Sequence, residues 1–265
     1  MAEKQVFDLI ISLGGNCSVA SQCIYRNIRK FSLPFDYSFM ANEDPIKYFP
    51  EGLKDRFKNF LLKENIKELK GKERGDEREK YQYKDTYTGY RYIHLFGNDI
   101  NVKGVYEKGF EVIQRRINRF YDSLAVSKKI LVICATDFVY DPKYIYKVKD
   151  TFEEIYPDKE FIFYALMFRS DANREILNKN VHIIYSERAV NLYDFNATNY
   201  EWAFLDDIVL SQVLNKKEPK KFFELKKLKK GCGVYLFPFA KNTLCRFKCY
   251  ILGLRFDICF GKVKE

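Results

Sequence analysis

The sequence predicts an α/β fold: a mainly parallel sheet with helices on both faces, followed by a basic aromatic C-terminal extension. Short apolar runs rich in Val, Ile and Phe alternate with segments of helical periodicity between 128 and 186, which is the pattern of consecutive βαβ units. The 265 residues include 24 Phe and 20 Tyr, so the chain can bury a large core. The net charge of +10 falls entirely within 216–265, whereas 1–215 is neutral. We therefore expect an α/β domain over 1–215 and an extension over 216–265.

The first elements surround a Gly-Gly-Asn-Cys turn. An apolar run predicts a buried strand over 6–14, and apolar residues at helical spacing predict a helix over 17–28. A proline and several aromatic residues interrupt the period that follows, so 30–39 is a predicted loop. Short helices are predicted over 44–62. The charge run over 63–80 is expected to be a solvated helix or a mobile excursion.

The later elements are more regular. Strands are predicted where apolar runs are short and uninterrupted, and helices where apolar residues recur every three or four positions. By these criteria, the sequence predicts strands over 90–96, 128–136, 160–168 and 181–186, and helices over 105–125, 142–156, 171–179 and 201–214.

Composition excludes several classes of site. The longest uncharged apolar runs are about half the length of a membrane-spanning helix, and the N-terminus lacks the layout of a signal peptide. The seven cysteines form no CxxC pair and the chain has only two histidines, so we predict neither a metal site nor a cofactor. The sequence favours a cytoplasmic protein with reduced thiols.

Ligand-binding residues are expected at the carboxyl ends of the parallel strands, where ligands bind in open α/β sheets. The turn formed by Gly14, Gly15 and Asn16 follows the first strand and precedes a helix, so its backbone N–H groups could bind a phosphate. Asp137 and Arg169 follow two later strands and are expected at the same edge. The glycines could equally serve only to form a turn with positive φ.

Cys17 is the first candidate for catalysis. A thiol at a helix N-terminus lies at the positive end of the helix dipole, which lowers its pKa. A nucleophilic cysteine also needs a base. His94 lies late in its predicted strand, whereas His182 begins its strand and is expected at the opposite end of the sheet. His94 is therefore the better partner, and the alternative is that Cys17 only packs in a tight turn.

Two segments together carry a family resemblance: "SLGGNC" over 12–17 and "SLPFDY" over 32–37. In this pattern, and in later segments up to about 214, the chain resembles a bacterial and viral family of papain-like cysteine peptidases. The resemblance implies Cys17 as nucleophile and His94 as general base. Asp36 and Asp207 are candidates for the residue that orients the base, with Asp99 a further possibility. The substrate, whether peptide, acyl compound or glycan, is not identified.

The C-terminal extension is similar to the C-terminal segments of bacterial sugar transferases from surface-polysaccharide clusters. This similarity implies an alternative function, a glycosyltransferase-like or other enzyme of surface-polysaccharide biosynthesis. In that case, a nucleotide-sugar or phosphorylated substrate would bind at the Gly14–Cys17 turn, and Cys17 would be structural.

The same extension holds 14 Lys and Arg against 4 Asp and Glu. Basic residues interleaved with aromatic ones can hold a protein on an anionic membrane, here the inner face of a bacterial membrane. A membrane-docked scaffold without catalysis is a third alternative, and nucleic acid is disfavoured because no recognisable nucleic-acid module precedes the extension. The extension could also be a solvated lysine helix followed by a hairpin. The residues predicted to face lipid headgroups are Lys226, Lys227, Lys229 and Lys230.

Overall fold

The computed structural model divides into two compact units, Met1–Lys216 and Lys217–Glu265. It describes residues 4–40, 42–70, 82–92, 102–136, 138–168, 174–178, 180–186, 200–211, 246–251 and 254–259. Of the second unit, the structure describes an antiparallel hairpin of β12 (Arg246–Ile251) and β13 (Leu254–Cys259). A hairpin in this extension agrees with the sequence, whereas the predicted lysine helix lies outside the described residues.

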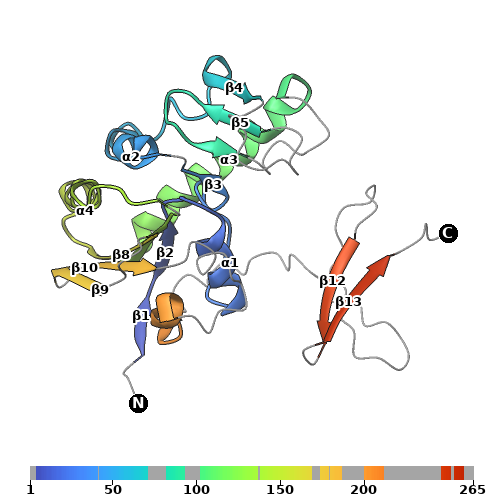
Figure 1. The fold of residues 1–265 in the computed structure, drawn as a ribbon. Coiled ribbons are helices and arrows are strands. Elements are labelled where there is room, and N and C mark those ends of the chain that lie inside the picture. Colours follow the sequence, from blue (N-terminus) through green and yellow to red (C-terminus); the bar gives the residue numbers. More distant parts are fainter. Residues whose placement is uncertain are drawn as a thin grey trace. The chain divides into compact units, whose positions relative to one another are not determined.

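The centre of the first unit is a five-stranded sheet in the order β2-β7-β8-β10-β9 (Figure 1). All neighbouring pairs are parallel except β10 and β9. The strands are β2 (Leu9–Ser12), β7 (Lys129–Ala135), β8 (Glu160–Phe168), β9 (Arg174–Asn178) and β10 (Val181–Ser186). The prediction of a mainly parallel sheet is confirmed, and β8 and β10 have the bounds that the sequence predicts.

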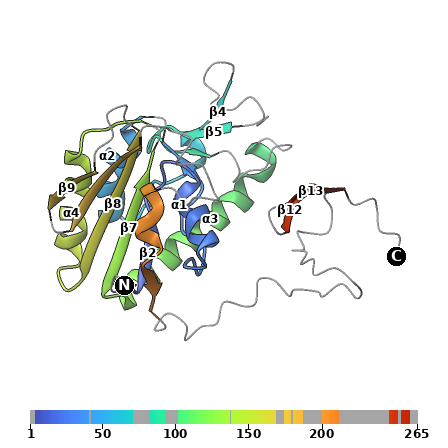
Figure 2. The ribbon, with the colours of Figure 1, turned by 60° about the horizontal axis from the view of Figure 1, so that its bottom comes forward.

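Helices cover both faces of this sheet, as predicted. Alternate residues of β7 point to opposite faces, so Ile130 and Val132 belong to one buried cluster and Leu131 and Ile133 to another. The first cluster contains α3 (Val102–Val126) and α4 (Lys143–Ile155), and the second contains α1 (Ser18–Tyr25) and the 3₁₀ helix η3 (Tyr200–Leu205). Figure 2 shows α4 and α1 on either side of β7 and β8.

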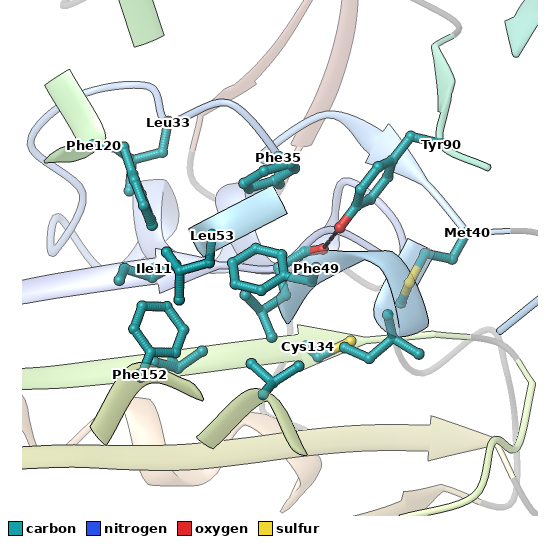
Figure 3. Packing of buried hydrophobic residues seen from close by; sticks show 14 of the residues in the cluster. Ile11, Leu33, Phe35, Met40, Phe49, Leu53, Tyr90, Phe120, Cys134 and Phe152 are labelled. Atoms are coloured by element: carbon teal, nitrogen blue, oxygen red, sulfur yellow. Dashed lines mark hydrogen bonds between the residues drawn. The ribbon is translucent and has the colours of Figure 1, made fainter. Parts of the chain in front are cut away.

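A smaller antiparallel sheet, in the order β3-β6-β5-β4, joins the first cluster. Phe35, in the loop before β3, is the centre of its packing (Figure 3). The ring centroids of Phe49, Phe57, Phe60 and Tyr90 lie 5.1–5.3 Å from that of Phe35. The elements here are α2 (Asp44–Lys54), β3 (Ser38–Phe39), β4 (Ile66–Leu69), β5 (Gln82–Asp85) and β6 (Arg91–Tyr92).

Three predicted elements differ from the structure. The strand over 6–14 bends at Asp8 into β1 (Gln5–Phe7) and β2, because β1 pairs with β11 (Ile208–Leu210) and β2 with β7. The predicted helix over 171–179 is wrong: the segment forms β9, which gains a full ladder by pairing with β10. The predicted helix over 201–214 is replaced by η3 and β11 for the same reason, since pairing with β1 outweighs local propensity.

The predicted solvated charge run over 63–80 is also wrong in its first part. Residues 63–65 form a 3₁₀ turn and 66–69 form β4, which pairs with β5. Of the predicted strand over 90–96, the structure describes β6 and no later residue. No helix among the described residues is long and apolar enough to cross a membrane.

Candidate functional site

The turn after β2 is built from two glycines with positive φ, +83° at Gly14 and +97° at Gly15. A Cβ on Gly15 would overlap the carbonyl of Ala135 at the end of β7, and a Cβ on Gly14 would lie 2.5 Å from Oγ of Ser38. Gly15 tolerates no side chain, because the atom that its Cβ would meet is a backbone carbonyl oxygen. The glycines therefore let the chain turn tightly against the end of the neighbouring strand.

Hydrogen bonds fix the turn from three sides. The Leu13 N–H donates to the Ile133 carbonyl (2.9 Å), and the Met40 N–H donates to the Gly15 carbonyl (3.1 Å). The hydroxyl of the buried Tyr90 donates to the Leu13 carbonyl (2.9 Å), the bond drawn in Figure 3. These three bonds hold the turn in one position relative to the neighbouring segments, and they thereby fix where the chain continues to Cys17.

Asn16 is fully buried beneath the start of α1. Its Oδ1 accepts a hydrogen bond from the Ser18 N–H (2.9 Å), which caps the first turn of the helix. Its Nδ2 donates to no atom of the part of the chain that the structure describes, and neither does the buried Ser18 hydroxyl. Buried polar groups are nearly always paired, so two unsatisfied groups beside one residue are characteristic of a site that takes a further partner.

Cys17 is the N-cap residue of α1 and is partly exposed. The two other cysteines of the first unit, Cys23 and Cys134, are buried, and burial raises the pKa of each to about 12. Burial also raises the pKa of Cys17, and the Cys17 backbone N–H acts in the opposite direction. The lowered pKa that the sequence predicts for Cys17 is therefore not found. Desolvation raises this pKa by more than the Cys17 backbone N–H lowers it.

The turn lies where two neighbouring parallel strands continue to opposite faces of the sheet. The chain leaves β2 for α1 on one face, and it leaves β7 for α4 on the other. In open α/β sheets, ligands usually bind at the carboxyl ends of the strands where such a divergence occurs. Cys17 follows the turn at this point, on the β2 side.

Asp36 lies in the loop between α1 and β3, beside Phe35, whose carbonyl oxygen lies 3.3 Å from where a Cβ on Gly14 would stand. Its Oδ2 forms an ion pair with Arg29 (2.6 Å) and accepts a hydrogen bond from the Leu33 N–H (2.8 Å). Burial raises the pKa of Asp36, and the Arg29 guanidinium opposes that shift. Its hydrogen-bond and ion-pair partners are thus residues of its own loop; it also interacts electrostatically with Arg116 and Cys23, and none of these residues is Cys17.

Asp207 is exposed and lies between η3 and β11. Its carbonyl accepts a hydrogen bond from the Gln5 N–H (2.9 Å), at the start of β1. Cys17 follows the far end of β2, so the structure does not bring Asp207 to Cys17. His182 is the second residue of β10 and stacks on Tyr164 (centroids 4.4 Å apart). The prediction that it lies at the opposite end of the sheet is wrong: Tyr164 is in the middle of β8, and the register continues through Ile133 to Ser12, the last residue of β2.

The remaining predicted residues lie outside the described residues. They are His94, Asp99, Asp137, Arg169 and the four lysines Lys226, Lys227, Lys229 and Lys230. Among the residues that are described, no group of three or more His, Cys, Asp or Glu side chains could hold a metal ion. Sequence reasoning missed Ser38 and Tyr90, which border the turn from distant segments and belong to no local motif.

Comparison with known proteins gives one match. The family model described as "Putative papain-like cysteine peptidase (DUF1796)" matches residues 8–154, which include the Gly-Gly turn, Cys17 and the loop with Asp36. No curated protein and no solved structure matches the chain.

Proposed function

The chain belongs to this family of putative papain-like cysteine peptidases, and on that premise we propose that it is a thiol-dependent hydrolase or acyl transferase with Cys17 as its nucleophile. The observation that carries the proposal is the position of Cys17. It is the partly exposed cysteine of the three in the first unit, at the N-terminus of α1, where the chain leaves the carboxyl end of β2.

The donors around Cys17 suit acyl transfer. Attack of the Cys17 sulfur on a carbonyl carbon forms a C–S bond and places negative charge on the carbonyl oxygen, which preorganised N–H donors stabilise. The backbone N–H groups at the start of α1 follow Cys17 directly, at the positive end of the helix dipole. Collapse of the intermediate expels the leaving group with a proton and leaves an acyl-thioester, which water or a second nucleophile then cleaves to restore the thiol.

His94 is the proposed base that takes the thiol proton and returns it to the leaving group. Support comes from the small sheet: Tyr92, two residues earlier, pairs with Ser38. The Ser38 Oγ in turn lies 2.5 Å from where a Cβ on Gly14 would stand. Tyr92, the last described residue before His94 in the sequence, therefore pairs with a residue at the edge of the turn. A base is needed because burial raises the pKa of Cys17 and favours the neutral thiol.

Acyl transfer to Cys17 gives a direct test. Full-length protein is mixed with a panel of chromogenic esters, acyl thioesters and peptide amides, and the first turnover is followed together with intact and peptide mass. We expect a stoichiometric burst and an acyl adduct on Cys17, absent in Cys17→Ala. Cys23→Ala, which removes a buried thiol of the same helix, is the matched control and keeps the burst. An equal burst in Cys17→Ala, or no adduct with any substrate class, contradicts the proposal.

A further inference from the structure

Three guanidinium groups converge on the loop 29–37, which follows α1. Arg29 donates to the Ser32 hydroxyl (2.8 Å) and to Asp36 (2.6 Å), and it also donates to the Tyr37 hydroxyl (3.1 Å). Arg119 of α3 donates to the Ser32 carbonyl (2.9 Å). Arg116 lies one helical turn before Arg119 on α3 and interacts electrostatically with Arg29 and Asp36. We call Arg29, Arg116 and Arg119 the arginine cluster.

The positive charge of the arginine cluster is not balanced. Asp36 is the one carboxylate that pairs with it among the described residues, and Arg29 occupies that carboxylate. Within the same residues, Arg116 forms neither an ion pair nor a hydrogen bond, although it is only partly exposed. Three positive charges therefore face one negative charge.

Such an excess is costly in a partly buried place. A charge removed from water is stabilised only if it is paired or hydrogen-bonded, and like charges repel one another there more strongly than in water. Burial is the main cause that lowers the pKa of Arg116, and the charges of Arg29 and Arg119 lower it further. The Asp36 carboxylate raises the pKa of Arg116, but the same carboxylate also forms the ion pair with Arg29.

We propose that the arginine cluster is a binding site for an oxyanion, a phosphate or carboxylate group of a small molecule. Guanidinium groups bind both through pairs of parallel N–H donors, and the Arg116 donors are unused by the described residues. One anion of charge −2 would neutralise the cluster together with Asp36. The site is separate from Cys17 and does not depend on the proposed reaction.

A pocket lies beside the cluster and is lined by one of its members, Arg29, but not by Arg116 or Arg119. Arg29, Phe31 and Asp36 line the pocket, which has about 400 Å³ of empty space, part of it open to solvent, and whose other walls are mostly apolar. The Arg119 guanidinium lies over the Phe31 ring, 5.5 Å from its centroid, so the pocket wall is in contact with the cluster. Lys30, the other basic residue of the pocket, interacts with Asp8 and adds no unbalanced charge.

Thermal unfolding of the full-length protein in matched salts tests the proposal. At constant ionic strength and pH 7, sodium phosphate or citrate replaces sodium chloride. We expect a saturable rise in Tm of about 2–4 °C with at least one of the two, because an anion bound only to the native state stabilises it. Phosphate and citrate identify which group the site prefers.

Two variants separate binding from a structural role. Arg116→Gln should abolish the rise, and in chloride its Tm should equal or exceed that of the wild type because a repulsive charge is gone. Arg115→Gln, which alters the exposed neighbouring arginine, should keep the full rise. The basic extension is identical in the two variants, so any change in Tm that anions cause through the extension is the same in both. The proposal is overturned if neither anion raises the wild-type Tm, if Arg116→Gln keeps the rise, or if this variant loses stability equally in all salts.

Discussion

The backbone of Gly15 lies directly against the carbonyl of Ala135, so that the turn carrying Cys17 is packed on the end of the neighbouring strand. No side chain fits between the two. Gly15 also has a φ of +97°, which residues with a Cβ rarely adopt. This contact ties the position of the candidate nucleophile to the edge of the central sheet.

Gly15→Ala should therefore destabilise the protein by more than about 3 kcal/mol, because the new Cβ meets a backbone carbonyl as well as an unfavourable φ. Gly14→Ala is the matched comparison. Its Cβ would meet the Ser38 hydroxyl, a side-chain atom that can rotate away, so its cost should be about 1–2 kcal/mol. Urea unfolding of both variants measures the two values. Equal costs would mean that the contact with Ala135 is not maintained in solution.

Cys17 should be alkylated by iodoacetamide at least about tenfold faster than Cys23 or Cys134 in folded protein at pH 8. It is partly exposed, whereas the other two are buried and have pKa values of about 12. Peptide mass spectrometry after brief labelling measures the three rates. Preferential labelling of either buried thiol, or of a cysteine in the extension, would argue against Cys17 as the nucleophile.

The pH dependence of this labelling tests the proposed role of His94. Burial raises the pKa of Cys17, so without a base the thiolate fraction at neutral pH is small, and the rate should rise about tenfold per pH unit below the pKa of the thiol. If His94 accepts the thiol proton, the wild type should show an additional reactive phase near neutral pH that His94→Ala lacks. Identical profiles in the two proteins would show that the residues are not coupled.

The central sheet could be predicted from the sequence because its strands are buried on both faces. The segments 160–168 and 181–186 are apolar runs with clear limits, and each matches a strand. The segment 174–178 has no such run. It becomes a strand only through its pairing with β10, a contact that no local pattern reveals.

Of the candidate site, too, only the part with a local sequence signal could be predicted. A Gly-Gly-Asn-Cys turn between strand and helix is a local signal, so Cys17 could be identified. Tyr90 and the arginine cluster could not, because their roles depend on contacts between distant segments. Tyr90 reaches Leu13, and Arg119 reaches Ser32. The raised pKa of Cys17 follows likewise from tertiary burial, which opposes the effect expected from the helix end alone.

The ion pair between Arg29 and Asp36 should matter more for stability than an exposed pair. Asp36→Asn leaves the largely buried Arg29 without its counter-ion and should cost about 3–5 kcal/mol. Asp158→Asn, which breaks the exposed pair with Lys128, should cost less than about 1 kcal/mol. Urea unfolding at pH 7 compares them. A small effect of Asp36→Asn would mean that the carboxyl is already protonated, the form that burial favours.

The final prediction concerns the extension. Residues 1–216 form a compact unit with both buried clusters inside it, so they should fold without 217–265 and retain most of the full-length Tm. Full-length protein should bind vesicles containing about one-third phosphatidylglycerol, because the extension carries the whole net charge of +10. Replacing Lys226, Lys227, Lys229 and Lys230 with Gln should weaken the binding, as should raising the salt concentration from 0.05 to about 0.5 M, since screening shortens the attraction. Vesicles of neutral phosphatidylcholine serve as the control. If the truncated protein is insoluble, or if the full-length protein ignores anionic vesicles at low salt, the extension belongs to the folded core and its lysines are ordinary surface residues.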